Sequence, residues 1–137
     1  MVRTSFFMPM VPPTITHQEH KLAVRNGKPV PYEPPELKDA RAKLMTYLAP
    51  NRPDVPFTVG VRLVAKWLFP ISGEHKNGEY KTSKPDTDNL NKLLKDCMTA
   101  TGFWKDDALV ASEIIEKFWA DTPGIYIKVE ALNYGTA

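Results

Sequence analysis

Clustered acidic residues mark the stretch of this chain that is best suited to chemistry. Asp86 and Asp88 are separated by one residue, and Lys92 follows one helical turn after Asp88. The adjacent pair Asp106 and Asp107 comes after a short turn. Bringing so many carboxylates together costs free energy unless cations lie between them. Mg²⁺ prefers oxygen ligands and is often held by one or two carboxylates together with a substrate phosphate. The spacing therefore indicates a divalent-metal site.

A helix beginning at this motif would arrange these groups for phosphodiester hydrolysis. Asp86 and Asp88 fall at its N-terminus, where backbone amides favour negative charge. If the turn at 102–105 returns the chain to that end, Asp107 completes a three-carboxylate pocket. Lys92 would then reach a phosphate oxygen or the charge that develops in the transition state. A metal ion held there would lower the pKa of a bound water and stabilise the leaving 3′ oxygen.

Each part of this pattern also has a purely structural interpretation. Aspartate is favoured at helix starts, so Asp86 and Asp88 taken alone are ordinary caps. An Asp-Asp pair is equally common in turns. Lys92 would serve as an i, i+4 partner for Asp88 and Asp96, worth about 0.3–0.5 kcal/mol. The pattern is not an EF-hand, because Asn91 stands where that loop requires glycine. Only the combination favours chemistry.

The elements expected around the motif define an α+β fold, with two main helices packed on a small mixed sheet of about four strands. Alternating apolar residues predict strands at 55–69 and 124–132, and runs rich in apolar, aromatic and β-branched residues predict strands at 5–8 and 108–119. Helical spacing of apolar residues predicts the helices, at 36–48 and 86–101. The order strand, helix, strand over 55–119 favours a parallel pair with a right-handed crossover. The turn at 121–124 is expected to join the last two strands as a hairpin.

Two long segments outside these elements carry basic and polar groups. Residues 11–35 contain six prolines and read as one long connection with groups suited to a phosphate backbone, namely Thr14, Thr16, His17, His20, Lys21, Arg25 and Lys28. Residues 70–83 form a loop rich in Gly, Ser and Lys that leads to the acidic motif. The candidate DNA contacts are Lys76, Lys81, Lys84 and Lys105. Solvated loops without any contact are the alternative interpretation.

Composition excludes several classes of protein. A length of 137 residues, with 42% hydrophobic and 25% charged residues, fits one folded domain spanning 1–137. The single cysteine, Cys97, excludes an intrachain disulfide. No run approaches the ~18 apolar residues of a membrane span. The three histidines show no metal-ligand spacing with cysteine, which argues against zinc. We therefore expect a soluble, cytoplasmic protein with no membrane partner.

Charge is distributed unevenly along the chain. Residues 1–50 carry seven Lys and Arg against four acids, and residues 51–85 carry six against three. Residues 86–137 carry five against nine. A metal-dependent nuclease needs cations for phosphates and carboxylates for the metal. Chance variation along a small domain explains the same counts, so this distribution does not decide between the two.

Two motifs of the chain together match a known family. Residues 84–92 read Lys-Pro-Asp-Thr-Asp-Asn-Leu-Asn-Lys, residues 102–107 read Gly-Phe-Trp-Lys-Asp-Asp, and the strand after them carries Lys117. This combination resembles the RusA family of Holliday junction resolvases. The family's signature is a Pro/Arg-Asp-x-Asp-Asn-Leu-x-Lys helix with a downstream Asp-Asp at about this separation. The resemblance is strong across 84–119 and topological elsewhere.

The resemblance implies a role for each acidic residue and for the lysine. Asp86, Asp88 and Asp107 would bind Mg²⁺, Lys92 would be the catalytic lysine, and Asp106 would be a neighbouring acid of the metal site. Family members are homodimers whose two sites cut opposed strands of a four-way DNA junction, and such a symmetric reaction requires a two-fold enzyme. The resemblance also implies a bacterial cytoplasm, a prophage or phage origin, and no organic cofactor.

The expected function is that of a Mg²⁺-dependent, structure-selective endodeoxyribonuclease. It would resolve Holliday junctions by paired symmetric nicks in DNA recombination and repair. The alternatives are a non-catalytic junction-binding protein of the same fold and a nuclease acting on other branched DNA. Clustered anions facing phosphates do not help a pure binder, which favours the enzyme. Ten residues of strand separate Lys117 from Asp107, roughly 33 Å, so we expect Lys117 to lie outside the metal site.

Overall fold

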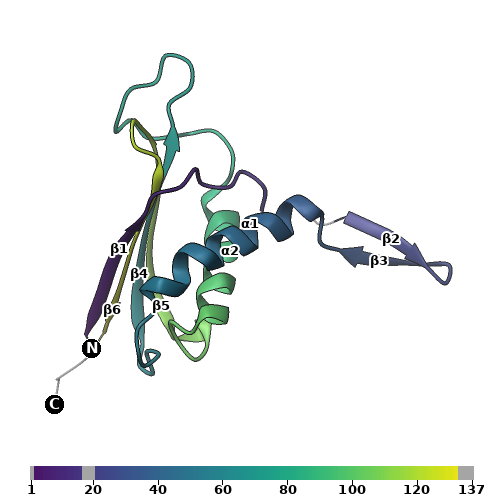
Figure 1. Cartoon of the computed structure of the whole chain (residues 1–137), viewed down its shortest axis with the longest axis horizontal. Helices are drawn as coiled ribbons and strands as arrows, with labels where there is room; N and C mark the ends of the chain where they lie inside the picture. Colours follow the sequence, from purple (N-terminus) through teal and green to yellow (C-terminus); the bar gives the residue numbers. More distant parts are fainter. Residues whose placement is uncertain (1, 17–20, 133–137) are drawn as a thin grey trace.

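The computed structural model describes residues 2–16 and 21–132, in which two helices cover one face of a four-stranded sheet and a two-stranded hairpin stands apart (Figure 1). This arrangement confirms the expected α+β class, with two main helices on a mixed sheet of four strands. The elements in chain order are β1 Arg3–Met8, β2 Lys21–Arg25, β3 Lys28–Tyr32, α1 Pro35–Leu48, η2 Ala49–Asn51, β4 Val61–Pro70, α2 Thr87–Thr101, η3 Asp107–Leu109, β5 Val110–Ala120 and β6 Gly124–Ala131.

The main sheet has the strand order β1-β6-β4-β5. β4 and β5 are parallel and are connected through α2, as predicted. The predicted hairpin between β5 and β6 is wrong, because β6 pairs with β1 and β4 instead. The turn at 121–123 therefore passes over the end of β4. The turn sequence determines that the chain reverses direction, whereas packing around the buried strand β4 determines which strands β6 pairs with.

The long strand predicted at 55–69 begins later than expected, at Val61. Pro56 has no N–H to donate to a strand partner. Val55 and Val59 are 73% and 46% exposed, so they do not continue the buried side of β4. Phe57 alone forms an isolated parallel bridge, with Trp104. Within β4 the predicted alternation holds, and the buried side chains on that parity are Val61, Leu63, Ala65, Trp67 and Phe69.

The connection predicted at 11–35 contains the β2–β3 hairpin. Its turn is Asn26-Gly27, and both residues have positive φ, 52° and 74°. This dipeptide is the usual signal of a two-residue hairpin turn, but the prolines at 29 and 31 obscured the strand that follows it. His17 and His20 lie outside the described residues. The hairpin projects from the start of α1, away from the main sheet (Figure 1).

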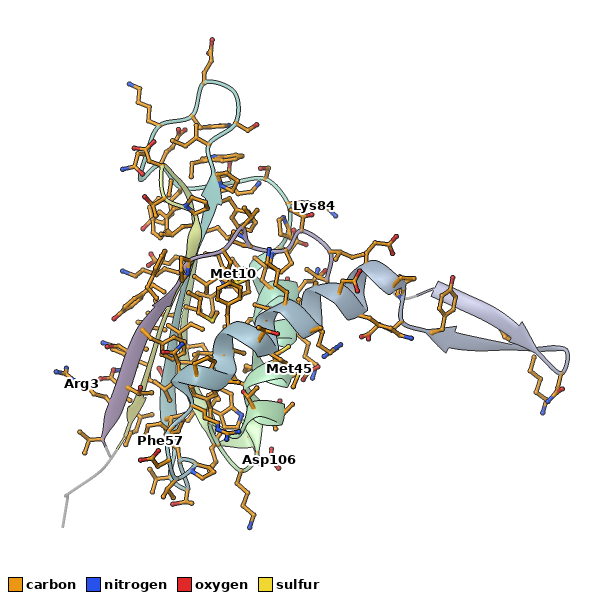
Figure 2. All side chains as sticks on the ribbon, in the orientation of Figure 1. Arg3, Met10, Met45, Phe57, Lys84 and Asp106 are labelled. Atoms are coloured by element: carbon orange, nitrogen blue, oxygen red, sulfur yellow. The ribbon has the colours of Figure 1, made fainter. Side chains whose placement is uncertain are left out.

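The core lies between the sheet and the two helices (Figure 2). The predicted apolar side of α2 is buried, with Leu90, Leu93, Leu94, Cys97 and Met98 all at most 1% exposed. α1 contributes Leu37, Leu44 and Leu48, each fully buried. Removing this apolar surface from water is the main stabilising contribution to the fold. Within the described ranges, no helix combines the length and the apolarity needed to cross a bilayer.

Candidate active site

The acidic residues singled out from the sequence lie at the two opposite ends of α2. Asp86 occupies the N-cap position and Asp88 lies in the first turn. Asp106 and Asp107 follow the C-terminus of the helix, at the start of η3. A 15-residue helix is about 22 Å long. Figure 2 shows Lys84 and Asp106 at opposite ends of this helix.

The expectation that the turn at 102–105 brings Asp107 back to Asp86 and Asp88 is therefore wrong. Gly102 ends α2 in the left-handed conformation, with φ 92°, and the chain then enters β5. β5 is parallel to β4. It therefore begins at one end of the strands, whereas the loop into α2 leaves β4 at the other end. Among the described residues, no three His, Cys, Asp or Glu side chains gather closely enough to hold a metal ion.

At the N-terminal end of α2, the carboxylate of Asp86 makes no capping hydrogen bond. Asp86 and Asp88 are both exposed, and they face a pocket of about 280 Å³. Thr14 and Thr16 line the same pocket, so part of the polar segment predicted to suit phosphates does lie beside the acids. Carboxylate and hydroxyl oxygens are ligands suited to a hard cation such as Mg²⁺. This end of α2 therefore offers the donors of a metal site.

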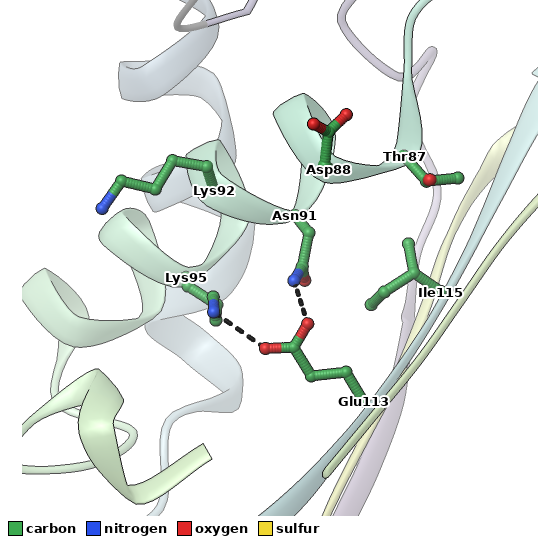
Figure 3. Close-up of a pocket in the computed structure, with 7 residues that line it drawn as sticks. All are labelled: Thr87, Asp88, Asn91, Lys92, Lys95, Glu113 and Ile115. Carbon is green, nitrogen blue, oxygen red and sulfur yellow. Dashed lines mark hydrogen bonds and ion pairs between the residues drawn. The ribbon is translucent and has the colours of Figure 1, made fainter. Parts of the chain in front are cut away.

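A second pocket, of about 420 Å³, lies between α2 and β5 (Figure 3). Residues spaced i, i+3, i+4 and i+7 share one side of a helix, which helps bring five α2 residues to the pocket. The residues that line it are Thr87, Asp88, Asn91, Lys92, Lys95, Glu113 and Ile115. Asp88 lines both pockets, so the two are adjacent.

Sequence reasoning missed the polar network in this second pocket. Glu113 on β5 accepts from Lys95 Nζ at 2.8 Å and from the amide of Asn91 (Figure 3). Asn91 is only 6% exposed, and its Oδ1 atom has no hydrogen-bond partner among the residues that the structure describes. The signal that could have found Glu113 is strand parity, since it lies on the same side of β5 as Ile115 and Lys117.

Lys92 forms the ion pair expected of a structural residue and also has the exposure that a catalytic role requires. Its Nζ lies 3.3 Å from Asp96 Oδ1, one turn further along α2. Asp96 also lies 3.9 Å from Arg41 Nη1, so it belongs to the contact between the two helices. The Lys92 side chain is nevertheless 56% exposed and lines the same pocket as Asp88. An exposed i, i+4 ion pair is weak, so a phosphate competes easily for this ammonium group.

The C-terminal end of α2 is built for packing. Trp104 is 1% exposed, and its Nε1 donates to Thr99 Oγ1 at 2.7 Å. Trp104 therefore packs in the core. Asp106 Oδ1 accepts from the backbone N–H of Ala108 at 2.8 Å and caps η3. The exposed Lys105 lies at this end, next to Asp106.

The loop at 70–83 is hydrogen-bonded to the second half of β5. The N–H of Gly78 donates to the carbonyl of Trp119, and the N–H of Trp119 donates to the carbonyl of Glu79. The N–H of Lys81 donates to the carbonyl of Lys117. Lys76 on this loop and Lys84 just after it are exposed, and Lys84 lines the pocket of Asp86.

Lys81 differs from the other candidate DNA contacts, because its side chain is turned inward. It is 8% exposed, and its Nζ donates to Ser83 Oγ at 2.6 Å and to the carbonyl of Lys84 at 2.7 Å. The ammonium group also lies 4.5 Å from the ring centroid of Trp119. Burial, with the nearby charge of Lys117, lowers the pKa of Lys81. Because this ammonium group is buried and bonded within the protein, Lys81 is not among the DNA contacts that we propose.

Lys117 lies beside the N-terminal end of α2, where the sequence did not lead us to expect it. Its Nζ donates to the carbonyls of Ser83 and Pro85, both at 2.7 Å. Lys117 is distant from Asp107 along β5, as predicted. Lys117 is therefore close to Asp86, because Asp86 and Asp107 lie at opposite ends of α2 within one chain.

Comparisons with known proteins agree with the motifs at this site. The family model for Endodeoxyribonuclease RusA matches residues 10–130. One relative is the Uncharacterized protein YqaN of Bacillus subtilis (strain 168), which is 25% identical over 122 residues, or 81% of this chain and 85% of that protein. Another is the Crossover junction endodeoxyribonuclease rusA of Lactococcus phage r1t, which is 33% identical over 69 residues, or 49% of this chain and 53% of the phage protein. The match therefore spans about half the length of this second relative.

Proposed function

Because this chain belongs to the RusA family of endodeoxyribonucleases, we propose that it is a structure-selective nuclease that resolves four-way DNA junctions with Mg²⁺. The observation that carries the proposal is the pair Asp86 and Asp88, exposed at a helix start with the Asp86 carboxylate unused for capping. The name of the phage relative supports a junction as the substrate. We include in the proposal a phage or prophage origin, a bacterial cytoplasm, and a role in recombination and repair.

The side chains at the N-terminal end of α2 support a division of labour. Asp86 and Asp88 would hold the cation, which when bound would draw charge away from the scissile phosphate. Lys92 would neutralise charge on a phosphate oxygen in the transition state. Lys84, in the adjacent pocket, would hold a neighbouring phosphate of the same strand. Lys76 and Lys105 would contact more distant parts of the junction.

A homodimer would bring the partner subunit's Asp107 to Asp86 and Asp88, which lie far from the Asp107 of their own chain. β5 is the last strand in the sheet order, and within the described residues the segment 78–81 makes backbone hydrogen bonds to its outer edge only at Lys117 and Trp119. The first half of this edge exposes Ala111, Glu113 and Ile114. Exposed strand edges are sites of pairing with another chain. This edge is the surface we propose for the homodimer.

Antiparallel pairing of two such edges has a chemical consequence. The start of one β5 would lie near the end of the other, because the two strands run in opposite directions about a two-fold axis. The partner subunit's Asp107 would then approach Asp86 and Asp88, and the three carboxylates would belong to one metal site. Two such sites per dimer match the two cuts that a junction requires. Asp106, as the capping residue of η3, would hold Asp107 in position.

The direct test is cleavage of a synthetic four-way junction with end-labelled strands, with Mg²⁺ and with EDTA. We expect paired nicks at symmetric positions with Mg²⁺, and none with EDTA. The variant Asp88→Asn is expected to bind the junction without cutting it. Binding by the wild type without cleavage in Mg²⁺ or Mn²⁺ would support a non-catalytic junction binder. Equal cleavage of flaps and forks would support a nuclease of broader branched DNA.

A further inference from the structure

Two lysines bind the backbone that leads directly into the acidic motif. Lys117 on β5 donates to the carbonyls of Ser83 and Pro85, both at 2.7 Å. Lys81 donates to the hydroxyl of Ser83 at 2.6 Å and to the carbonyl of Lys84 at 2.7 Å. All three residues of the segment 83–85 are thus hydrogen-bonded to an ammonium group, and the next residue in the chain is Asp86.

This arrangement brings two like charges close together in a partly desolvated place. Lys81 is 8% exposed, and desolvation together with the charge of Lys117 lowers its pKa. Placing two ammonium groups side by side is unfavourable unless both are well compensated. The carbonyl acceptors provide part of that compensation. The rings of Trp119 and Phe69, 4.5 and 5.3 Å from Lys81 Nζ, provide more through cation–π attraction.

The segment 83–85 is connected to the main sheet through Lys117. Lys117 lies on β5, which pairs with β4 along its length as far as Ala120. Trp119 is 8% exposed and exchanges backbone hydrogen bonds with the segment 78–79. The ring of His75 stacks on that of Trp119, with centroids 4.4 Å apart and an interplanar angle of 9°. The segment 83–85 is therefore tied to the sheet and not only to its neighbours in the loop.

We propose that Lys81 and Lys117 are positioning residues of the nuclease centre. They fix the backbone immediately before Asp86, so that Asp86 and Asp88 keep the orientation in which they receive a divalent cation. The proposal rests on the proposed function. Neither lysine is proposed to contact DNA or the metal. The proposal explains why the ammonium groups of two lysines next to an acidic motif are directed at carbonyl groups. Partners that orient ligands in this way typically contribute 10–100-fold to metal affinity or activity.

The test compares Lys117→Met with Lys117→Arg in the full-length protein. Methionine keeps much of the length and the apolar stem of lysine but donates no hydrogen bond. Arginine keeps the charge and has donors for two carbonyls. Lys128→Met is the matched control, because Lys128 is a partly exposed lysine on β6 whose Nζ lies 3.9 Å from Glu130 Oε1, away from the segment 83–85.

The first readout is binding of Mn²⁺ alone, measured by electron paramagnetic resonance, and the second is junction cleavage as a function of Mg²⁺ concentration. We expect Lys117→Met to weaken Mn²⁺ binding about 10–100-fold and to shift the Mg²⁺ requirement of cleavage upward by a similar factor. Junction affinity should stay within about twofold of wild type, since a twofold change corresponds to only ~0.4 kcal/mol. Lys117→Arg should recover most of the loss, and Lys128→Met should behave as wild type.

The proposal is overturned if Lys117→Met binds Mn²⁺ and cleaves junctions as the wild type does. It is also overturned if Lys117→Arg is as defective as Lys117→Met, because a charged donor would then make no difference. If Lys117→Met does not fold, Lys117→Leu, which also donates no hydrogen bond, is judged by the same two outcomes. A wild-type protein that binds Mn²⁺ but cuts no junction would refute the proposed function and leave the Mn²⁺ comparison valid.

Discussion

Asp86 and Asp106 occupy the same kind of position and are used differently. Each is the N-cap residue of a helix, in an extended backbone conformation. Asp106 accepts a hydrogen bond from the backbone N–H of Ala108 at 2.8 Å, whereas Asp86 makes no capping hydrogen bond. The same residue type at the same local position is thus structural at one end of α2 and not committed to capping at the other.

The surroundings of Asp86 and Asp106 also differ. Beside Asp86, two pockets open on either side of Asp88. Just before Asp106, Phe103 and Trp104 are 0% and 1% exposed and belong to the core. Asp86 and Asp88 therefore line pockets, whereas the residues that immediately precede Asp106 pack in the core. Asp107 is the residue that this contrast leaves unexplained within one chain, and the proposed dimer accounts for it.

The largest expected effect comes from mixing two inactive variants. Asp88→Asn and Asp107→Asn should each lose junction cleavage by on the order of 100–1,000-fold, since each removes a charged group that acts on the transition state. In a mixed dimer with shared sites, one site carries both substitutions and the other carries none. Co-refolding the two variants should therefore restore nicking of one strand per junction, which a denaturing gel of end-labelled strands detects.

Mixing distinguishes a shared site from a site within one chain. If Asp107 acted together with Asp88 of its own chain, both sites of every mixed dimer would be defective and cleavage would stay absent. Asp88→Asn mixed with itself provides the control for any gain caused by refolding. A monomeric wild-type protein in light scattering would contradict the shared site directly.

The next prediction compares Lys92 and Lys95, two lysines of α2 that line the same pocket. Lys92→Ala should lower kcat about 100-fold, because Lys92 is expected to act on the transition state. Lys95→Ala should change kcat only a few-fold, since Lys95 Nζ is bound to Glu113 at 2.8 Å and contributes an ordinary surface ion pair. Single-turnover cleavage of the junction measures both. Equal losses for the two variants would remove the special role of Lys92.

A smaller effect tests the contrast between the two N-cap aspartates through stability. Asp106→Ala should lower the free energy of unfolding by about 1 kcal/mol, the usual cost of losing a capping side chain. Asp86→Ala should change it by less than about 0.5 kcal/mol, because no capping hydrogen bond is lost. Urea unfolding followed by tryptophan fluorescence gives both values. A larger loss for Asp86→Ala would mean that Asp86 caps α2 in solution.

The smallest effect concerns Cys97, in the middle of α2. Burial raises the pKa of its thiol from an ordinary value of 9.0 to about 11. Between about pH 9 and 11 the unfolded chain loses this proton while the folded protein keeps it, so the free energy of unfolding falls as pH rises. Below that window the contribution is fully present. Cys97→Ala should remove this part of the pH dependence, and parallel curves for the two proteins in urea unfolding would contradict it.

Local sequence patterns were sufficient to predict the elements that carry the site. Prolines at 34 and 35 start α1, Gly102 ends α2, and apolar residues at helical spacing predicted the buried side of each helix. The alternation from Val61 to Phe69 predicted the central strand, and the order of elements predicted that β4 and β5 are parallel. The helix ends, the buried sides and the central strand depend on residues within a few positions of one another, and the parallel pairing follows from the order of elements, so all of them can be read along the chain.

Only the tertiary structure decided how these elements bring residues together. The sheet order placed β6 between β1 and β4, and the path of the chain after Gly102 left Asp107 a helix length away from Asp86. The same register brought Lys117 to the start of α2, Glu113 to Asn91 and Lys81 into a buried position. Each of these contacts joins residues that are distant in sequence or depends on how a loop packs against a strand. The sequence determined the chemical groups and their local structure, whereas the free energy of packing determined which groups meet.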